Sequence, residues 1–153
     1  MSFRSALSAR RTRRSKEVTT ATYPVTVADH GKTLLLNRAA GITVTLPADT
    51  SFVGFTVDFI VRDNFSGTLT IQGAASGDLF FGAVTIVSTT AGKADTFGPN
   101  GSSNDTMVCN SNAKGRAKGG RVSFTLMGAN EWLVEGRLHG VGATMATPFD
   151  DQS

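Results

Sequence analysis

The residues of this chain that could do chemistry are few and lie far apart in the sequence. Gly31-Lys32-Thr33 matches the end of a phosphate-binding loop, but Thr26 stands where the first glycine of that motif belongs. The segment 33–37, TLLLN, has the composition of a strand and not of the helix that such a loop requires. We therefore interpret Gly31 as the glycine of a hairpin turn.

The two histidines and the single cysteine do not form a recognisable reactive group. A hydrolase triad needs a nucleophile in a strained turn, whereas His30 lies in a polar turn and His139 follows the last predicted strand. We interpret both histidines as surface residues. Cys109 has no second cysteine to pair with, and two histidines are too few for a protein-only metal site. We expect no metal and no cofactor.

The acidic residues also lack the pairing that catalysis by carboxylates requires. Asp58 lies on the opposite strand face from the phenylalanines beside it, which predicts a solvent or interface residue. Five other aspartates occupy predicted turns, where this side chain commonly accepts hydrogen bonds from its own backbone; they are Asp49, Asp63, Asp78, Asp95 and Asp105. We predict that the protein is not an enzyme.

The basic charge is concentrated at the N-terminus. Residues 1–16 hold six of the 15 basic residues and no acidic one, so the other nine face 12 acidic residues and leave a net charge of −3. We predict that residues 1–20 form an extended arm that orders only against a partner. The predicted partner-binding residues are Phe3, Arg4, Leu7, Arg10, Arg11, Arg13, Arg14 and Lys16.

Two other interpretations of the arm remain open at this level. An arginine cluster can neutralise nucleic-acid phosphates, and an arginine- and serine-rich, acid-poor N-terminus is also typical of an organellar transit peptide. Direct nucleic-acid binding is disfavoured because the rest of the chain is acidic. No apolar run approaches the roughly 20 residues that span a bilayer, and no secretory signal is recognisable, so we expect synthesis in a cytoplasm and no membrane partner.

From Tyr23 onward the hydrophobic residues alternate with polar ones, which is typical of half-buried strands. Phe55, Val57, Phe59 and Val61 share one strand face and are the predicted core. Ala129-Asn130 separates two runs and predicts a hairpin. The predicted strands cover 23–27, 33–37, 42–46, 52–61, 68–72, 79–88, 106–110, 121–128 and 131–138.

These elements predict an all-β fold, a single β-sandwich or jelly-roll-like domain over 21–140 with a surface tail at 141–153. A partly open barrel and the order of the strands stay open. Residues 89–104 and 112–120 are predicted loops. The second loop contains Lys114-Gly115-Arg116-Ala117-Lys118, whose cations suit either a contact with phosphate or an acidic partner or a solvated loop. Trp132 is predicted as a core or rim residue, with a ligand-stacking platform as the alternative.

Four phrases of the body resemble a β module of tailed-bacteriophage virion proteins. They are DHGKTLLLNRAAGITVTLP (29–47), GFTVDFIV (54–61), SGTLTIQG (66–73) and NEWLVEG (130–136). Both small capsid decoration (cement) proteins and tail-fibre modules are similar to this sequence. The short chain and its basic arm resemble a decoration protein more closely.

The resemblance implies a structural protein on the capsid exterior, made in the host cytoplasm and assembled as a homotrimer. Its implied partner is the phage major capsid protein, whose neighbouring copies it would bridge with the arm. The alternative within the same group is a tail, neck or fibre component that contacts the host surface through 89–104 and 112–120.

Overall fold

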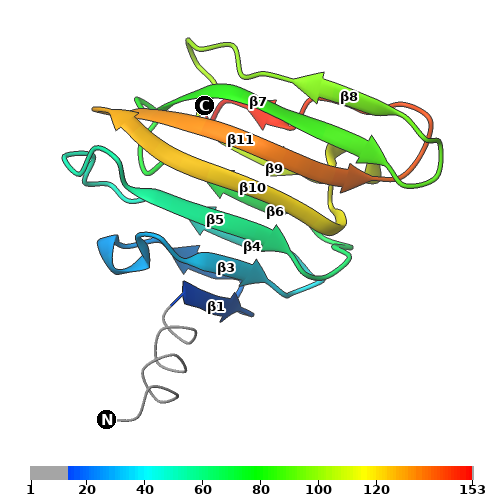
Figure 1. The fold of residues 1–153 in the computed structure, drawn as a ribbon, viewed down its shortest axis with the longest axis horizontal. Coiled ribbons are helices and arrows are strands. Elements are labelled where there is room, and N and C mark those ends of the chain that lie inside the picture. The colour runs from blue at the N-terminus through cyan, green and yellow to red at the C-terminus, as the bar shows by residue number, and fades with distance from the viewer. Residues whose placement is uncertain (1–13, 153) are drawn as a thin grey trace, which may run out of the picture.

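The computed structural model describes residues 14–152, in which strands form two sheets (Figure 1). One sheet contains β1 (Ser15–Val18), β3 (Thr33–Leu36), β5 (Thr56–Val61), β7 (Leu79–Ser88), β8 (Ala94–Phe97), β10 (Ala117–Gly128) and β11 (Glu131–Gly140). The other contains β2 (Thr22–Pro24), β4 (Ile42–Thr45), β6 (Leu69–Gln72), β9 (Thr106–Cys109) and β12 (Phe149–Asp150). Two short 3-10 turns, η1 (Val27–Asp29) and η2 (Asn112–Lys114), complete the elements.

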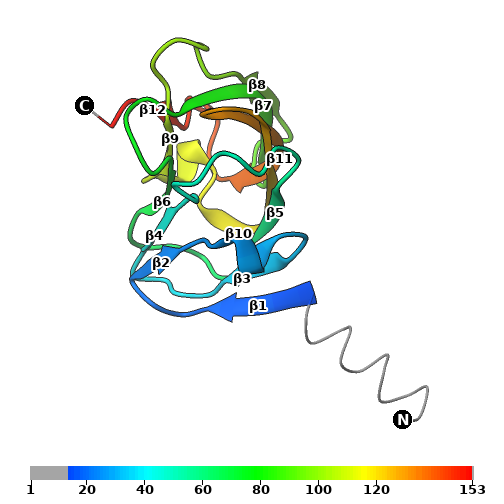
Figure 2. The same cartoon turned by 90° about the vertical axis from the view of Figure 1, so that its left-hand side faces the viewer.

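The strand order is β1-β3-β5-β10-β11-β7-β8 in the first sheet and β12-β9-β6-β4-β2 in the second. The sheets lie face to face, as the view along the strands shows (Figure 2). The predicted all-β sandwich is therefore confirmed. Within the described residues, no helix is long and apolar enough to cross a membrane.

The first half of the sandwich is wound as a flattened coil. From β1 to β6 the chain alternates between the two sheets, and each strand lies parallel to the preceding strand of its own sheet. Parallel neighbours need a crossover connection, and here a strand of the opposite sheet serves as that crossover. The predicted hairpin at Gly31 is therefore wrong: this glycine, at φ 73°, lies in the link between β2 and β3, which belong to different sheets.

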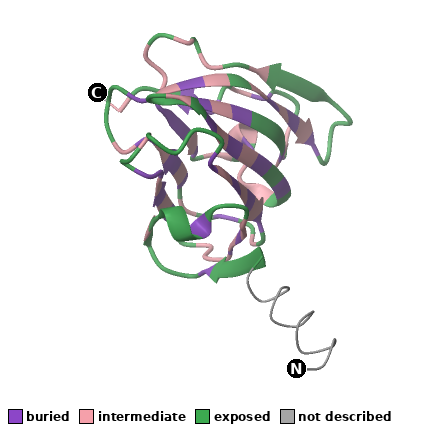
Figure 3. Ribbon diagram, turned by 60° about the vertical axis from the view of Figure 1, so that its left-hand side comes forward, coloured by how far each residue is buried: buried purple, intermediate pink, exposed green. Residues whose placement is uncertain are grey.

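The core lies between the two sheets and is built from alternating positions. Phe55, Val57, Phe59 and Val61 are each at most 1% exposed, which confirms the predicted core face. Figure 3 shows the same alternation of buried and less buried residues along the strands. Successive side chains of a strand point to opposite faces, so every second residue is buried when one face packs against the other sheet.

Aromatic rings join the strands of the first sheet from the inside. The ring of Phe124 lies 5.7 Å from that of Phe59 and 5.3 Å from that of Phe80, in edge-on arrangements. The Trp132 ring lies 6.0 Å from that of Phe55 and is fully buried, so of the two predicted positions, core or rim, it occupies the core.

The second half contains the predicted hairpin. Strands β10 and β11 pair antiparallel, and Asn130 between them has a φ of 59°, a left-handed conformation that asparagine tolerates. Strand β10 also pairs antiparallel with β5, and β11 pairs parallel with β7. The hairpin therefore forms the middle of the seven-stranded sheet.

The ends of the body differ from the sequence prediction. Ser15–Val18, predicted as part of a free arm, is an edge strand, because Val18 finds a place in the core beside β3. The predicted surface tail contains β12, which pairs with β9 and buries Phe149 together with Met145. Neither short segment carries an alternation that is detectable without knowledge of its neighbours.

Some internal boundaries also shift. The predicted strand 52–61 begins only at Thr56, because 52–55 forms a turn. The predicted strand 23–27 ends at Pro24. The predicted loop 89–104 contains β8, which includes Asp95, and the predicted loop 112–120 contains η2 and the start of β10.

Candidate interaction surface

The root of the basic arm is built into the edge of the seven-stranded sheet. Strand β1 pairs parallel with β3, with Ser15 opposite Thr33 and Val18 opposite Leu36. The backbone N–H of Asn37 donates to the carbonyl of Val18 at 2.9 Å, which continues the pairing beyond the strand. Because Val18 is 1% exposed, the chain is anchored in the core only a few residues after the arm.

Lys16 lies on the inward side of this root and contacts Tyr23 of β2. Its Nζ atom lies 4.7 Å from the centre of the Tyr23 ring, a cation–π arrangement. The Tyr23 hydroxyl donates to Oδ2 of Asp29 at 3.0 Å, and the Thr26 backbone N–H donates to the same oxygen at 3.1 Å. Burial raises the pKa of Tyr23, and the interaction with the Tyr23 side chain raises the pKa of Lys16. Lys16 is therefore a charged residue held against the body.

Glu17 lies on the outward side of the same strand. It forms an ion pair of 3.0 Å with Arg62 and accepts a hydrogen bond from the Asn37 side chain. Both partners of the ion pair are about half exposed, so the pair contributes only about 0–1 kcal/mol.

The arm leaves from one particular end of the sandwich. Ser15 pairs with Thr33 and Thr33 with Asp58, so the N-terminal ends of β1, β3 and β5 lie together. Strand β10 runs the other way and pairs Thr125 with Thr56, which brings its C-terminal end to the same place. Figure 1 shows the start of β1 and the turns before β3 and β5 at this end.

Exposed apolar side chains gather at this end. The end patch, as we call it, consists of Val27, His30, Phe52, Val53 and Met127. Its four apolar members are 41–57% exposed. The ring of His30 lies 5.0 Å from that of Phe52, and the N–H of Gly54 donates to the carbonyl of Leu126 at 2.8 Å, which places 52–54 beside the end of β10.

A second feature lies on the outer face of the seven-stranded sheet. A shallow hollow of about 310 Å³ is lined by Gly119, Arg121, Ser123, Glu135, Gly136 and Arg137. Arg121 forms an ion pair with Asp58 of β5, and the Ser123 hydroxyl donates to Asp58 at 2.6 Å. Asp58 is thus on the outer face, as predicted, and it holds Arg121 in place.

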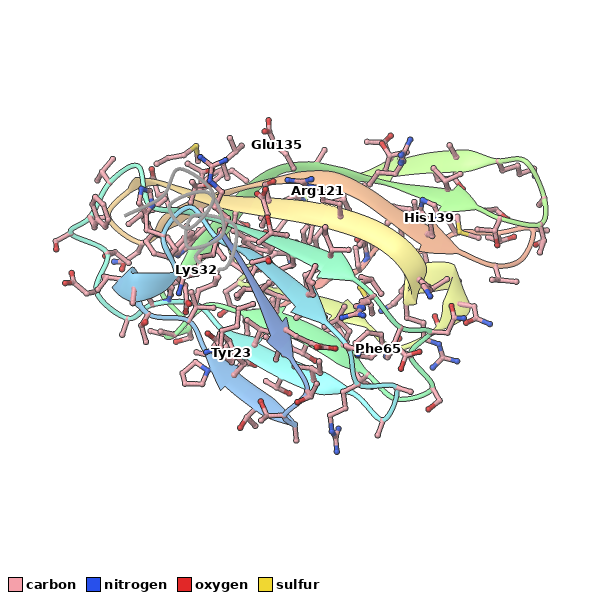
Figure 4. All side chains as sticks on the ribbon, turned by 60° about the horizontal axis from the view of Figure 1, so that its bottom comes forward. Tyr23, Lys32, Phe65, Arg121, Glu135 and His139 are labelled. Carbon is pink, nitrogen blue, oxygen red and sulfur yellow. The ribbon has the colours of Figure 1, made fainter. Side chains whose placement is uncertain are left out.

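The other two charged side chains of the hollow are free. Within the described residues, neither Glu135 nor Arg137 has a side-chain hydrogen bond or ion pair. The outer face therefore offers one acceptor and one cation near each other. Figure 4 shows Arg121 and Glu135 on this face, away from Tyr23 and Lys32 near the root of the arm.

The predicted partner-binding residues fall into two groups. Phe3, Arg4, Leu7, Arg10, Arg11 and Arg13 lie outside the described residues. Arg14 is exposed directly before β1, and Lys16 contacts Tyr23. The base of the arm thus lies at the same end of the sandwich as the end patch.

The basic segment 112–120 is more ordered than a solvated loop. The Arg116 guanidinium donates to the carbonyl oxygens of Ser66 at 3.0 Å and Asn110 at 3.2 Å, and to the Asn112 side chain at 3.1 Å. Arg116 therefore has a structural role. Lys118 is exposed beside the hollow-lining Gly119.

The sequence prediction missed the end patch because it placed Phe52 and Val53 in a strand. Two adjacent apolar residues followed by Gly54 break the period of two, and this break was the available signal. The histidines lie in different places: His30 is exposed and accepts the N–H of Thr56 at 3.1 Å, whereas His139 is half-buried.

No protein-family model matches this chain, and no curated protein matches it. The arrangement of its surfaces therefore carries the functional argument.

Proposed function

We propose that this protein is a structural virion component that binds the outside of a phage capsid and bridges neighbouring major capsid proteins. The observation that carries this proposal is the place where the basic arm joins the body. Its root is anchored in the sheet at the end of the sandwich that also carries the end patch. The basic arm thus joins the body at the end that also carries an apolar contact surface.

The two elements suit a partner that is both acidic and partly apolar. Arginine side chains form charge-assisted, often bidentate hydrogen bonds with carboxylates. A cluster of exposed apolar residues on a small body marks a protein contact. A protein that binds only the assembled shell adds its binding free energy to the stability of that shell.

We further propose that the bodies act as a homotrimer, as the resemblance implies. Three arms joined through one assembly bind multivalently, so that weak single contacts give firm attachment.

The decisive experiment is co-sedimentation with empty capsids of the source phage, using the full chain and a chain that begins at Arg14. The truncation removes Arg4, Arg10, Arg11 and Arg13 but keeps β1. We expect the truncated chain to remain in the supernatant while its circular dichroism is unchanged. Undiminished sedimentation would refute the role of the arm, and native mass spectrometry of the full chain tests the trimer.

A second candidate function is a tail, neck or fibre component that contacts the host surface. The observation in its favour is the hollow on the outer sheet face, where Glu135 and Arg137 are free to bind a polar ligand. Immunogold labelling of whole virions with antibody against residues 21–153 separates the two. Gold over the head faces supports the decoration function, and gold confined to the tail supports the alternative.

A further inference from the structure

The hollow on the outer face of the seven-stranded sheet has a lining of charged side chains, one hydroxyl and bare glycine backbone. Its residues lie on β10 and β11, in the middle of the sheet: Gly119, Arg121, Ser123, Glu135, Gly136 and Arg137. A volume of about 310 Å³ is within the range of small-ligand pockets. Because the hollow is on the outer face, its side chains are accessible to a ligand (Figure 4).

The two arginines of the hollow are direct neighbours across the strands. Arg121 of β10 is paired with Arg137 of β11 in the antiparallel register. Side chains at such positions have Cβ atoms about 4.5–5.5 Å apart, and two like charges there destabilise a sheet. An anionic group in the hollow reduces this repulsion and accepts charge-assisted hydrogen bonds from both guanidinium groups.

Arg121 is held in position and still has donors to offer. It donates to Oδ2 of Asp58 at 2.5 Å, while its side chain is 58% exposed. A guanidinium group has five N–H donors, so this bond leaves others for a ligand. Asp58 is engaged through both oxygens, since its Oδ1 accepts the Ser123 hydroxyl at 2.6 Å. Asp58 therefore orients Arg121, whereas Arg137 has no ion-pair partner among the described residues.

The other polar groups of the hollow accept hydrogen bonds. Glu135 is exposed and has no ion-pair partner within residues 14–152. The Ser123 oxygen donates its proton to Asp58 and keeps lone pairs that accept. Gly136 separates Glu135 from Arg137, and a Cβ there would lie 2.2 Å from the Arg121 backbone oxygen. The backbone between the two charged side chains therefore stays free of a side chain.

These groups select a ligand that carries an anion with hydrogen-bond donors beside it. A bare anion suits the two arginines but is repelled by Glu135, whereas a hydroxyl group next to the anion donates to Glu135. A peptide fits less well, because peptides are usually recognised along an exposed sheet edge or in an apolar groove. This hollow lies in the middle of the sheet and has no apolar side chain in its lining.

We propose that the hollow binds an acidic saccharide. Arg121 and Arg137 bind its carboxylate, and Glu135 and the Ser123 oxygen accept hydrogen bonds from its hydroxyl groups. The inference deepens the second candidate function, on which its biological role rests, by naming the ligand class. Binding itself is a property of the isolated protein, so the binding test and the immunogold labelling of virions can fail independently.

The test is an NMR titration of the full chain, labelled with nitrogen-15, with glucuronate, glucose or acetate. Glucuronate carries both a carboxylate and hydroxyl groups, whereas glucose lacks the carboxylate and acetate lacks the hydroxyl groups. We expect glucuronate to shift the amide signals of Gly119 and Gly136, with a dissociation constant on the order of 1 mM for a ligand of this size. Glucose and acetate should bind about tenfold more weakly or not at all.

Two substitutions on the outer face separate the roles of the arginines and the glutamate. Arg137→Gln should weaken glucuronate binding about tenfold or more, because it removes a charged donor. The matched control is Lys93→Gln, which removes the same charge from an exposed position between β7 and β8 and should leave binding unchanged. Glu135→Ala should weaken glucuronate binding but strengthen acetate binding, since it removes an acceptor and a repulsive charge together.

The titration of the wild type decides even if a variant does not fold. Equal affinities for acetate and glucuronate would overturn the saccharide, and equal affinities for glucose and glucuronate would overturn the role of the arginines. Absence of glucuronate binding, or shifts confined to residues away from Gly119 and Gly136, would overturn the site. Undiminished glucuronate binding by a folded Arg137→Gln chain would do the same. None of these outcomes depends on capsid binding.

Discussion

Strand β1, at the base of the arm, is part of the folded body, and this predicts where the chain can be shortened without loss of stability. A chain that begins at Arg14 keeps β1, whereas a chain that begins at Ala21 loses it. We expect the first truncation to leave the free energy of unfolding unchanged and the second to lower it. The two differ by only seven residues, of which Val18 alone is buried.

The size of the loss follows from the contacts of β1. Burial of Val18, which is 1% exposed, is worth about 1.5–3 kcal/mol. The hydrogen bond from Asn37 to Val18 and the bonds of the β1–β3 pairing each add about 0.5–1.5 kcal/mol. The longer truncation should therefore cost about 3–5 kcal/mol, a large part of the roughly 5–15 kcal/mol that a domain has.

The assay is urea unfolding followed by the fluorescence of Trp132, the only tryptophan and a fully buried one. A single substitution tests whether burial of Val18 causes this loss. Val18→Ala removes two buried methyl groups and should lower the free energy of unfolding by about 1.6 kcal/mol. The control Val27→Ala alters an exposed side chain and should leave the free energy of unfolding almost unchanged. Equal urea midpoints for the two truncations would refute the assignment of β1 to the fold.

Three further predictions concern other parts of the body. Phe52→Ser in the end patch should weaken capsid co-sedimentation without changing the urea midpoint, whereas Val141→Ser, exposed at the opposite end, should change neither. Gly82→Ala should cost about 2 kcal/mol or more in urea unfolding, because its Cβ would lie 2.3 Å from the Val134 carbonyl at a φ of 97°. Gly77→Ala, with open space around it, is the control, and equal midpoints would contradict the steric argument. Burial raises the pKa of Cys109 to about 12, so its thiol should react with a thiol reagent at mildly alkaline pH only after unfolding; a fast reaction of the folded protein would show that the site opens.

Much of the fold could be predicted because the relevant signal is local. Alternation of apolar and polar residues reports which side of a strand is buried, whatever that strand pairs with. This is why the core positions from Phe55 to Val61 were predicted correctly. The hairpin turn at Asn130 was also predictable, since its conformation is set by the residues of the turn itself.

The choice of strand partners was not predictable in the same way. A polar turn between two apolar runs indicates that the chain changes direction, but not whether the next strand stays in the same sheet. The link containing Gly31 therefore suggested a hairpin, although β2 and β3 lie in opposite sheets. Strands as short as β1 and β12 become strands only because a neighbouring edge and a space in the core exist to receive them.

The candidate sites show the same difference between local sequence signals and contacts between distant segments. The sequence by itself determined that the chain is β-rich and that its basic charge is concentrated in an N-terminal arm, because composition and alternation are properties of consecutive residues. Only the tertiary structure decided that this arm joins the body at the same end of the sandwich as Phe52 and Met127. These residues are far apart in the chain, and the pairing of strands from distant segments is the physical cause that brings them together.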